Sequence, residues 1–372
     1  MLQTVGTRSS SLWVITLATV IALFLNGCSG PEGKKQAQGI ITSANDNREY
    51  RHIRLANKMD VLLISDPTAD KAAASLDVYI GSYQNPQDRA GLVHFLEHML
   101  FLGTKKYPVV GEYSEYLAAN QGMSNAYTAG ENTNYYFEVN NDAFVNSLDR
   151  FAQFFLEPLF DEAYVKREMN AVHSEHQKNL KSDLWRGHRV LENLMHKDHP
   201  QRKFSTGSLE TLGHVTRADL LEFYKKHYSA NRMSLVLLSP LSLDEQEKLV
   251  KEKFAAIKNS QTSEATYSSK IYDESDLPRY VYIKSIKDMR TLELIFATPK
   301  SLGYWKTKPL DLLSFLVGHE GKGSLLSLLK KKKLATSLSS GAEKTSYSSQ
   351  FHVNVNLTKE GLTKVDEVIA DF

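Results

Sequence analysis

Cysteine is almost absent from this sequence, and neither sign of charge dominates it. The chain has one cysteine, Cys28, in 372 residues, so an internal disulfide and a thiolate-rich structural zinc site are both excluded. Lysine and arginine total 45 against 43 aspartate and glutamate residues, a net charge of +2 that gives no reason to expect a nucleic-acid partner. With 42% hydrophobic residues, the chain nevertheless has ample material for one or two globular domains.

A hydrophobic run long enough to cross a membrane is also lacking. The apolar stretch 12–25 is shorter than the about 20 residues that a spanning helix needs, and it has the length of a signal-peptide core. The residues Leu-Asn-Gly-Cys that end at Cys28 resemble the lipobox of bacterial lipoproteins. The sequence therefore predicts a lipoprotein signal at 1–27, lipidation of Cys28 and a flexible tether at 28–45. An uncleaved anchor and a cleaved signal without a lipid are the alternatives.

This interpretation also predicts a location. A lipid on Cys28 would anchor the protein to a membrane at the periplasmic face of a bacterial cell envelope. Ser29, which follows the cysteine where an aspartate is absent, favours sorting to the outer membrane.

The chemistry of the sequence concentrates in segment 93–101, which contains the pattern His-x-x-Glu-His. Apolar residues spaced three and four apart predict an amphipathic helix here, with Asp88 as its N-cap. On such a helix His94 and His98 project from one face, as two ligands of a zinc ion do. Glu97 lies close enough to reach a water on that metal. The alternative is a helix whose histidines are half-buried, hydrogen-bonded and purely structural. A third metal ligand elsewhere in the sequence would distinguish a zinc site from this alternative.

A second helix, predicted at 161–180, carries two carboxylates on one face. Glu168 and Glu175 are seven positions apart and fall about 20° from alignment, although a solvated acidic stripe would give the same pattern. Between the two helices, segments 122–128 and 133–139 predict two strands joined by a polar turn. The first strand is a candidate sheet edge with free backbone groups, and an ordinary hairpin fits equally well.

Several segments resemble a known family. Segments 94–108, 124–128 and 132–139 are similar to the insulysin and pitrilysin subfamily of zinc peptidases, and less similar to the mitochondrial processing peptidases. In that family a glutamate at about the position of Glu175 completes the zinc site, and a second glutamate stands where Glu168 does. The similarity continues through 182–185, 199–200 and 204–207.

The resemblance implies a role for each residue of the site. His94, His98 and Glu175 would hold one Zn²⁺, the only cofactor expected, with the fourth position open as in catalytic zinc sites. Glu97 would be the catalytic general base. Glu168 would be the second catalytic residue, tuning the site from beside the ligands.

The resemblance also implies where a peptide substrate lies. The peptide would bind as an added strand through Asn125, Ala126 and Tyr127, with Phe101 lining the pocket beside the scissile bond. A separate pair, at 319–320 in a glycine-flanked turn, has a poor spacing for chelating one metal, and we interpret it as structural.

The implied fold is α+β, built of pitrilysin-like α/β domains of which one is complete and a second incomplete. The first peptidase domain, with the zinc site, is predicted at 46–262 and the incomplete domain at 263–372, with strands at 280–286 and 292–298. Members of the subfamily are far longer, with four related domains in two halves. A missing C-terminal half is therefore a possible partner.

The function expected from these observations is zinc-dependent hydrolysis of short peptides by an endopeptidase. The alternative is an inactive or partner-dependent scaffold subunit of the same family that lacks the C-terminal half. A third possibility, a processing-peptidase subunit that pairs with another chain, fits the incomplete second domain less well.

Overall fold

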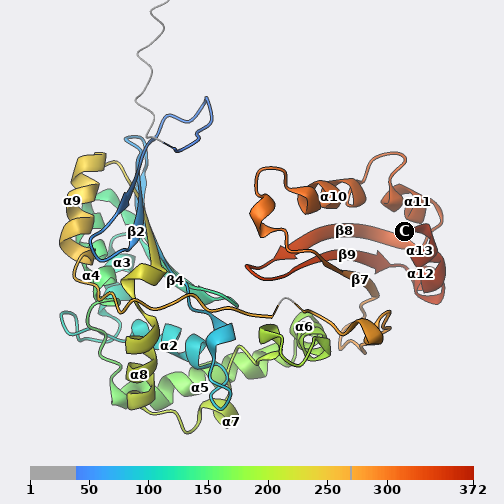
Figure 1. Ribbon diagram of the computed structural model, residues 1–372, viewed down its shortest axis with the longest axis horizontal. Coiled ribbons are helices and arrows are strands. Elements are labelled where there is room, and N and C mark those ends of the chain that lie inside the picture. The colour runs from blue at the N-terminus through green and yellow to red at the C-terminus, as the bar shows by residue number, and fades with distance from the viewer. Residues whose placement is uncertain (1–38, 269) are drawn as a thin grey trace, which may run out of the picture.

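The computed structural model describes residues 39–268 and 270–372, and its elements form two bodies (Figure 1). The first body is a six-stranded sheet with helices α2 to α9, and the second body is a three-stranded sheet with helices α10 to α13. Residues 1–27 and Cys28, for which a signal and lipidation are predicted, lie outside the described residues. The mixture of helices and strands agrees with the predicted α+β class.

The sheet of the first body has strand order β1-β2-β6-β3-β5-β4 and is antiparallel except for the β2–β6 pair. Its strands are β1 (Glu49–Arg54), β2 (Asp60–Ser65), β3 (Lys71–Val78), β4 (Met123–Thr128), β5 (Thr133–Asn140) and β6 (Met233–Ser239). Every second residue of β3, β5 and β6 is buried, because one face of the sheet carries the core. Strand β4 lies at the end of this order and has one free edge, as predicted.

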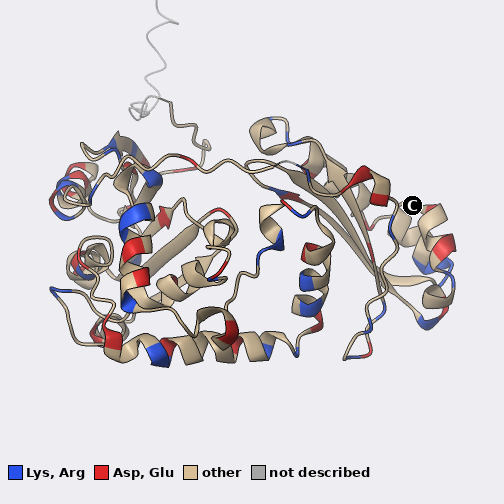
Figure 2. Cartoon of the chain, turned by 60° about the horizontal axis from the view of Figure 1, so that its bottom comes forward, with Lys and Arg blue, Asp and Glu red and all other residues tan. Residues whose placement is uncertain are grey.

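The helices of the first body pack on one another and, in part, on the buried face of this sheet. They are α2 (Leu92–Leu100), α3 (Glu112–Ala119), α4 (Phe144–Gln153), α5 (Glu162–Asn179), α6 (Asp183–Leu194), α7 (Leu209–Leu212), α8 (Arg217–His227) and α9 (Leu243–Phe254). Contacts with the strands come from α2, α3, α4 and α9, and α5 packs along α2. Figure 2 shows acidic and basic residues interspersed along the helices of both bodies, in keeping with the small net charge.

The start of α2 differs from the prediction that Asp88 is its N-cap. The helix begins after Gly91, whose φ of 90° is left-handed, and the buried side chain of Asn85 accepts the Val93 N–H at 3.0 Å. The backbone of Gly207 approaches so closely that a Cβ on Gly91 would lie 2.2 Å from its Cα. This contact with a segment far along the chain, which local periodicity does not report, sets where the helix starts.

The second body has its own small core. Strand order is β7-β9-β8, from β7 (Thr291–Thr298), β8 (Ala335–Lys344) and β9 (Ser349–Leu357), and its helices are α10 (Pro309–Val317), α11 (Leu325–Lys331), α12 (Lys359–Thr363) and α13 (Val365–Asp371). The strand predicted at 280–286 is wrong: these residues belong to no strand, and Tyr282 is 94% exposed. The alternating apolar residues there meet no partner strand among the described residues. The domain boundaries at 46–262 and 263–372 stay predictions.

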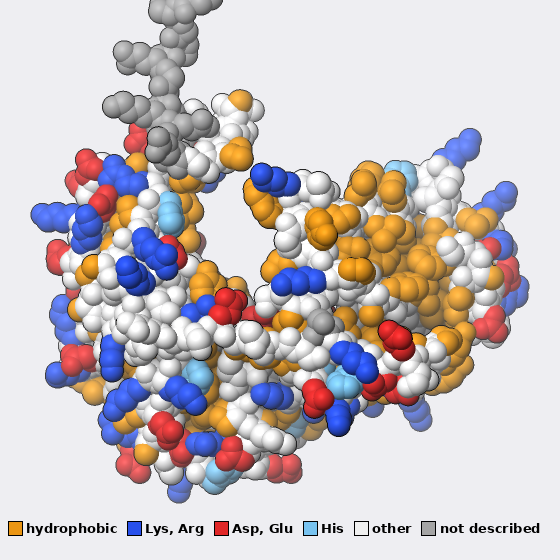
Figure 3. All heavy atoms as spheres, in the orientation of Figure 1, with side chains coloured by type: hydrophobic (Ala, Val, Ile, Leu, Met, Phe, Trp, Pro, Cys, Tyr) orange, Lys and Arg blue, Asp and Glu red, His pale blue; other side chains and the backbone are white. Residues whose placement is uncertain are grey.

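Much of the apolar surface of the second body is exposed. Helix α10 has no buried residue, and Leu312, Phe315 and Leu316 are each about 60% exposed or more. Figure 3 shows hydrophobic side chains gathered over this body far more densely than over the first. Among the described ranges, none of the helices is long and apolar enough to cross a lipid bilayer.

Two histidines predict how stability depends on pH. Burial lowers the pKa of His199 to about 4 and that of His227 to about 4, below the usual 6.5. His199 is 2% exposed, and neither ring nitrogen has a hydrogen-bond partner among the described residues. Between pH 6.5 and 4 the unfolded chain binds more protons than the folded chain. The contribution of these two neutral histidines to the free energy of unfolding is therefore fully present above pH 6.5 and is lost as the pH falls toward 4.

Urea unfolding at a series of pH values measures this loss. We expect His199→Gln to reduce the proton uptake on unfolding by up to about one proton per chain between pH 6.5 and 4. His319→Gln, at an exposed position in the second body, is the matched control. An unchanged slope in the His199 variant would contradict the assignment.

Candidate metal centre

Helices α2 and α5 bring the three predicted metal ligands together. His94 and His98 project from α2, with ring centroids 4.8 Å apart, and Glu175 faces them from α5. The carboxylate oxygens of Glu175 lie 3.5 Å from Nε2 of His94 and 3.7 Å from Nε2 of His98. One donor atom from each of the three residues lies within 4.8 Å of the other two.

The donor set suits a zinc ion. Two imidazole nitrogens and one carboxylate oxygen are the protein ligands of many catalytic zinc sites, and a fourth position is then left for water or substrate. The side chains of His94 and His98 are 18% and 19% exposed and that of Glu175 is 42% exposed, so the donors are reachable from solvent. Among the described residues, this is the one group of three or more such side chains that could hold a metal.

The orientation of His94 is set by a backbone group. Its Nδ1 lies 2.8 Å from the carbonyl oxygen of Thr206. A carbonyl oxygen can only accept, so Nδ1 must carry the proton, and the lone pair of Nε2 is left for a metal.

Glu168 plays the corresponding part for His98. Its Oε2 lies 3.5 Å from Nδ1 of His98, and its Oε1 accepts a hydrogen bond from Nε of Arg167 at 3.0 Å. Burial acts to lower the pKa of His98, but the hydrogen bond that His98 donates to Glu168 and the charge of Glu175 outweigh it and raise that pKa. The same hydrogen bond lowers the pKa of Glu168. Glu168 therefore orients a ring and lies outside the three-donor group.

Glu97 is buried beside this group. The side chain is on α2, the residue is 7% exposed, and its Oε2 accepts a hydrogen bond from the hydroxyl of Thr128 at 2.5 Å. Burial raises the pKa of Glu97, against the opposing effects of the His94 charge and the Thr128 hydrogen bond. A raised pKa suits a group that must take up a proton and release it again.

The predicted substrate residues lie on or near the free edge of β4. Asn125 and Tyr127 are exposed, and Ala126 between them is partly buried against the core. Phe101 follows α2 and packs with the rings of Tyr113, Tyr135 and Phe154 at centroid distances of 5.3–6.4 Å. The substrate roles of these residues stay predictions.

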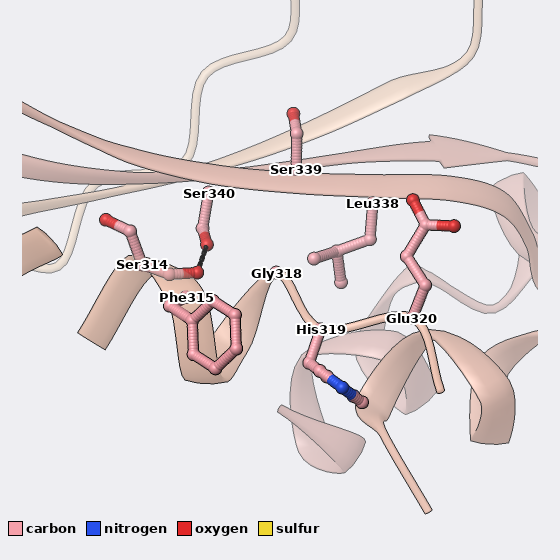
Figure 4. A pocket seen from close by; sticks show the side chains of 8 residues that line it. All are labelled: Ser314, Phe315, Gly318, His319, Glu320, Leu338, Ser339 and Ser340. Carbon is pink, nitrogen blue, oxygen red and sulfur yellow. Dashed lines mark hydrogen bonds between the residues drawn. The ribbon is translucent and has the colours of Figure 1, made fainter. Parts of the chain in front are cut away.

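The pair His319 and Glu320 lies in the second body, away from the three donors. Both are exposed and line a cavity of about 520 Å³ between α10 and β8, in which Ser340 donates a hydrogen bond to the carbonyl of Ser314 (Figure 4). Nδ1 of His319 accepts the N–H of Gly321 at 3.1 Å, a local turn contact.

Two groups of the site were not predicted from the sequence. The Thr206 contact comes from a backbone carbonyl, for which side-chain patterns give no signal. Thr128 had a weak signal, because the two-residue alternation of β4 places it on the same partly buried face as Ser124 and Ala126.

Comparisons with known proteins place the sequence in a family. Residues 60–198 match the family model for the insulinase peptidases, peptidase family M16, and residues 214–372 match the model for the peptidase M16 inactive domain. The human insulin-degrading enzyme is 44% identical over 92% of this chain and 34% of its own length. The A-factor-processing enzyme of Saccharomyces cerevisiae is 44% identical over 87% of this chain and 32% of its own length.

Solved structures give the same picture of the fold. The crystal structure of pitrilysin superposes with a TM-score of 0.82 and 33% identity, covering 91% of this chain and 36% of pitrilysin. A protease from Helicobacter pylori, at 22% identity and a TM-score of 0.74, shares the fold over 87% of this chain.

The predicted location is contradicted by the sequence relatives named above and one further relative. They are eukaryotic proteins from yeast and human, and a further one at 44% identity, from Arabidopsis thaliana, is named an insulin-degrading enzyme-like peroxisomal protein. The prediction of a signal, of a membrane-anchored lipoprotein through Cys28 and of a bacterial outer-membrane or periplasmic location is therefore wrong. It depended on the apolar stretch 12–25 and on one short pattern of small residues before a cysteine, both of which can arise without any processing.

The chain spans about a third of the length of these curated relatives. Within that third, the superposition with pitrilysin shows the fold, and both family models and the 44% identity point to one family. The chain belongs to the insulinase family of peptidases, peptidase family M16.

Proposed function

We propose that this chain carries the catalytic zinc site of an endopeptidase that cleaves short peptides. The observation that supports the proposal best is the convergence of the His94, His98 and Glu175 donors beside the buried carboxylate of Glu97. Relatives named as an insulin-degrading enzyme and an A-factor-processing enzyme make peptides the natural substrate class.

His94, His98 and Glu175 would hold the ion, which when bound supplies a Lewis acid that makes water acidic enough to lose a proton near neutral pH. The residues around it handle the proton. Oε2 of Glu97 is engaged by Thr128, so Oε1 is the atom that accepts a proton from the attacking water. Glu97 then delivers this proton to the nitrogen of the leaving amine, which restores the carboxylate.

The free edge of β4 is the proposed peptide-binding surface. An extended peptide would add to β4 through the backbone at Asn125, Ala126 and Tyr127, because an edge strand presents unpaired N–H and C=O groups. Phe101 would lie beside the scissile bond. Since β4 ends at Thr128, a peptide on this edge would run toward the Glu97 carboxylate.

A partner-dependent scaffold is the alternative function, and the apolar surface of the second body favours it. Leu312, Phe315 and Leu316 on α10 are exposed to an extent that a folded body in water rarely tolerates. We propose that the second domain, at 263–372, is incomplete and packs against further polypeptide of the kind the longer relatives contain. Peptide cleavage by the chain would then require that C-terminal half.

Removing a donor tests the metal site. We expect His94→Ala, His98→Ala and Glu175→Ala each to abolish stoichiometric zinc binding, measured by isothermal titration calorimetry and by metal analysis after dialysis, because two donors hold zinc far more weakly than three. Glu168→Gln is expected to weaken binding by about 10–100-fold. His319→Ala is the matched control, and full zinc retention by any of the three donor variants would remove that residue from the site.

Replacing the proposed base tests the reaction. Glu97→Gln should retain zinc and lower the rate of peptide cleavage by about 10²–10⁴-fold, because the amide cannot accept the proton. The assay compares the 372-residue chain alone with the same chain mixed with a C-terminal half from a longer relative. Cleavage only in the mixture supports partner dependence, whereas a zinc-loaded chain that is inactive in both supports the scaffold.

A further inference from the structure

The proposed base is held by the hairpin that carries the proposed peptide-binding edge. The hydroxyl of Thr128, the last residue of β4, donates to Oε2 of Glu97 at 2.5 Å. Oε1 of Glu97 accepts no hydrogen bond from the residues that the structure describes. A carboxylate with one fixed and one free oxygen has a defined orientation, so the position of Thr128 decides where Oε1 points.

The turn that follows Thr128 is clamped from one side by the first body. The carbonyls of Ala129 and Gly130 accept the N–H groups of Ser82 and Tyr83 at 2.8 and 2.9 Å. The approach is so close that a Cβ on Gly130 would lie 2.2 Å from the Tyr83 ring. The turn therefore follows the backbone at Ser82 and Tyr83 closely.

The second body holds the same turn from the other side. The carboxylate of Glu131 accepts the backbone N–H of Ser346 at 2.9 Å and also the Ser346 hydroxyl. Ser346 lies in the turn between β8 and β9, whose tip reaches the end of β4 in Figure 1. Next to it, the Tyr347 ring packs on that of Tyr83 with centroids 5.7 Å apart.

Other contacts also join the two bodies: Gln201 donates to Oε1 of Glu343 at 3.3 Å, and the Tyr347 ring packs against that of His199 with centroids 5.5 Å apart. Among the described residues of the second body, Ser346 is the one that hydrogen-bonds to the turn at 129–132. A cavity of about 410 Å³, lined by Glu131, Ser346 and Asp77 among others, opens beside this contact. The two hydrogen bonds to Glu131 therefore carry a large share of the hold on this turn, and hydrogen bonds to a charged group are among the stronger ones.

We propose that Thr128 is a positioning residue for Glu97, and that the second body sets its position through the contact between Glu131 and Ser346. The effect on turnover rests on the proposed function, whereas the effect on the hairpin does not. A displacement of reacting groups by about 1 Å can cost about 10²-fold in rate, so a small shift of the turn would be felt at Glu97. The second body would in this way help to set the turnover rate without touching the substrate.

The first test separates positioning from binding. Thr128→Val keeps the shape but removes the donor, and we expect kcat to fall about 10–100-fold, KM to change less than about twofold and bound zinc per chain to stay the same. Thr128→Ser restores the hydroxyl and should recover most of kcat. A kcat within twofold of the unmodified chain for the valine variant, or no recovery by serine, would overturn the role of Thr128.

A structural readout keeps this test independent of cleavage. The crystal structure of the Thr128→Val chain should show the Glu97 carboxylate rotated away from its original position. If the unmodified chain cleaves no peptide, either alone or mixed with the C-terminal half of a longer relative, and the carboxylate has rotated, the proposed function fails and the positioning role stands. If the carboxylate has not moved, the positioning role fails whatever the activity.

The second test addresses the link between the bodies. In the zinc-loaded chain, Glu131→Ala should speed amide hydrogen exchange at residues 123–135 by about 10-fold or more. Ser346→Ala removes the hydroxyl but keeps the backbone N–H, so its effect should be smaller. The double variant should add little to the Glu131 effect, because Glu131→Ala already removes both hydrogen bonds. Glu138→Ala, on the same hairpin but paired with Lys71 at 2.7 Å, is the control and should leave exchange at these amides unchanged. Unchanged exchange in the Glu131 variant, or equal acceleration in the control, would overturn the link.

Discussion

The candidate site depends on the burial of α2. Six of its nine residues are apolar and at most 1% exposed: Leu92, Val93, Phe95, Leu96, Met99 and Leu100. At roughly 1.5–3 kcal/mol for each side chain, their burial contributes on the order of 10 kcal/mol, whereas keeping one carboxylate out of water costs several. The free energy gained by burying the apolar side chains is larger than the cost of desolvating the carboxylate. The helix can therefore hold Glu97 in a buried position. His94 and His98 are the polar residues of the helix whose side chains remain partly exposed to solvent.

The polar groups around α2 then form a connected set in which each ring or carboxylate has a partner that limits its freedom. Thr206 holds His94, Glu168 holds His98, and Thr128 holds Glu97. These partners come from a loop, from α5 and from the β4–β5 hairpin, so the site is assembled from segments that are far apart in the sequence. Only tertiary packing brings them to one place, and a loss of packing in any one segment would be felt at the donors.

Much of this arrangement could be predicted from local patterns. The capping boxes of Thr216 with Asp219 and of Ser242 with Glu245 mark the starts of α8 and α9, and the three-and-four spacing marks α2 itself. Local patterns do not predict the structure where a contact with a distant segment of the chain determines it. The start of α2 depends on Gly207, and β8 is rich in serine and small residues, so its sequence has little alternation to report. The segment at 280–286 has the alternation but finds no neighbouring strand.

The contact between Gly91 and Gly207 has a consequence for the chemistry of the metal donors. It lies next to Thr206, whose carbonyl accepts a hydrogen bond from Nδ1–H of the His94 ring. The close crossing of the backbone at Gly91 and Gly207 thus helps to determine which nitrogen of the His94 ring is left free to bind a metal. A single methyl group at the crossing would push the carbonyl away and leave the ring free to present its other tautomer. The absence of a Cβ atom at both Gly91 and Gly207 therefore helps to determine which nitrogen of His94 is available as a ligand atom.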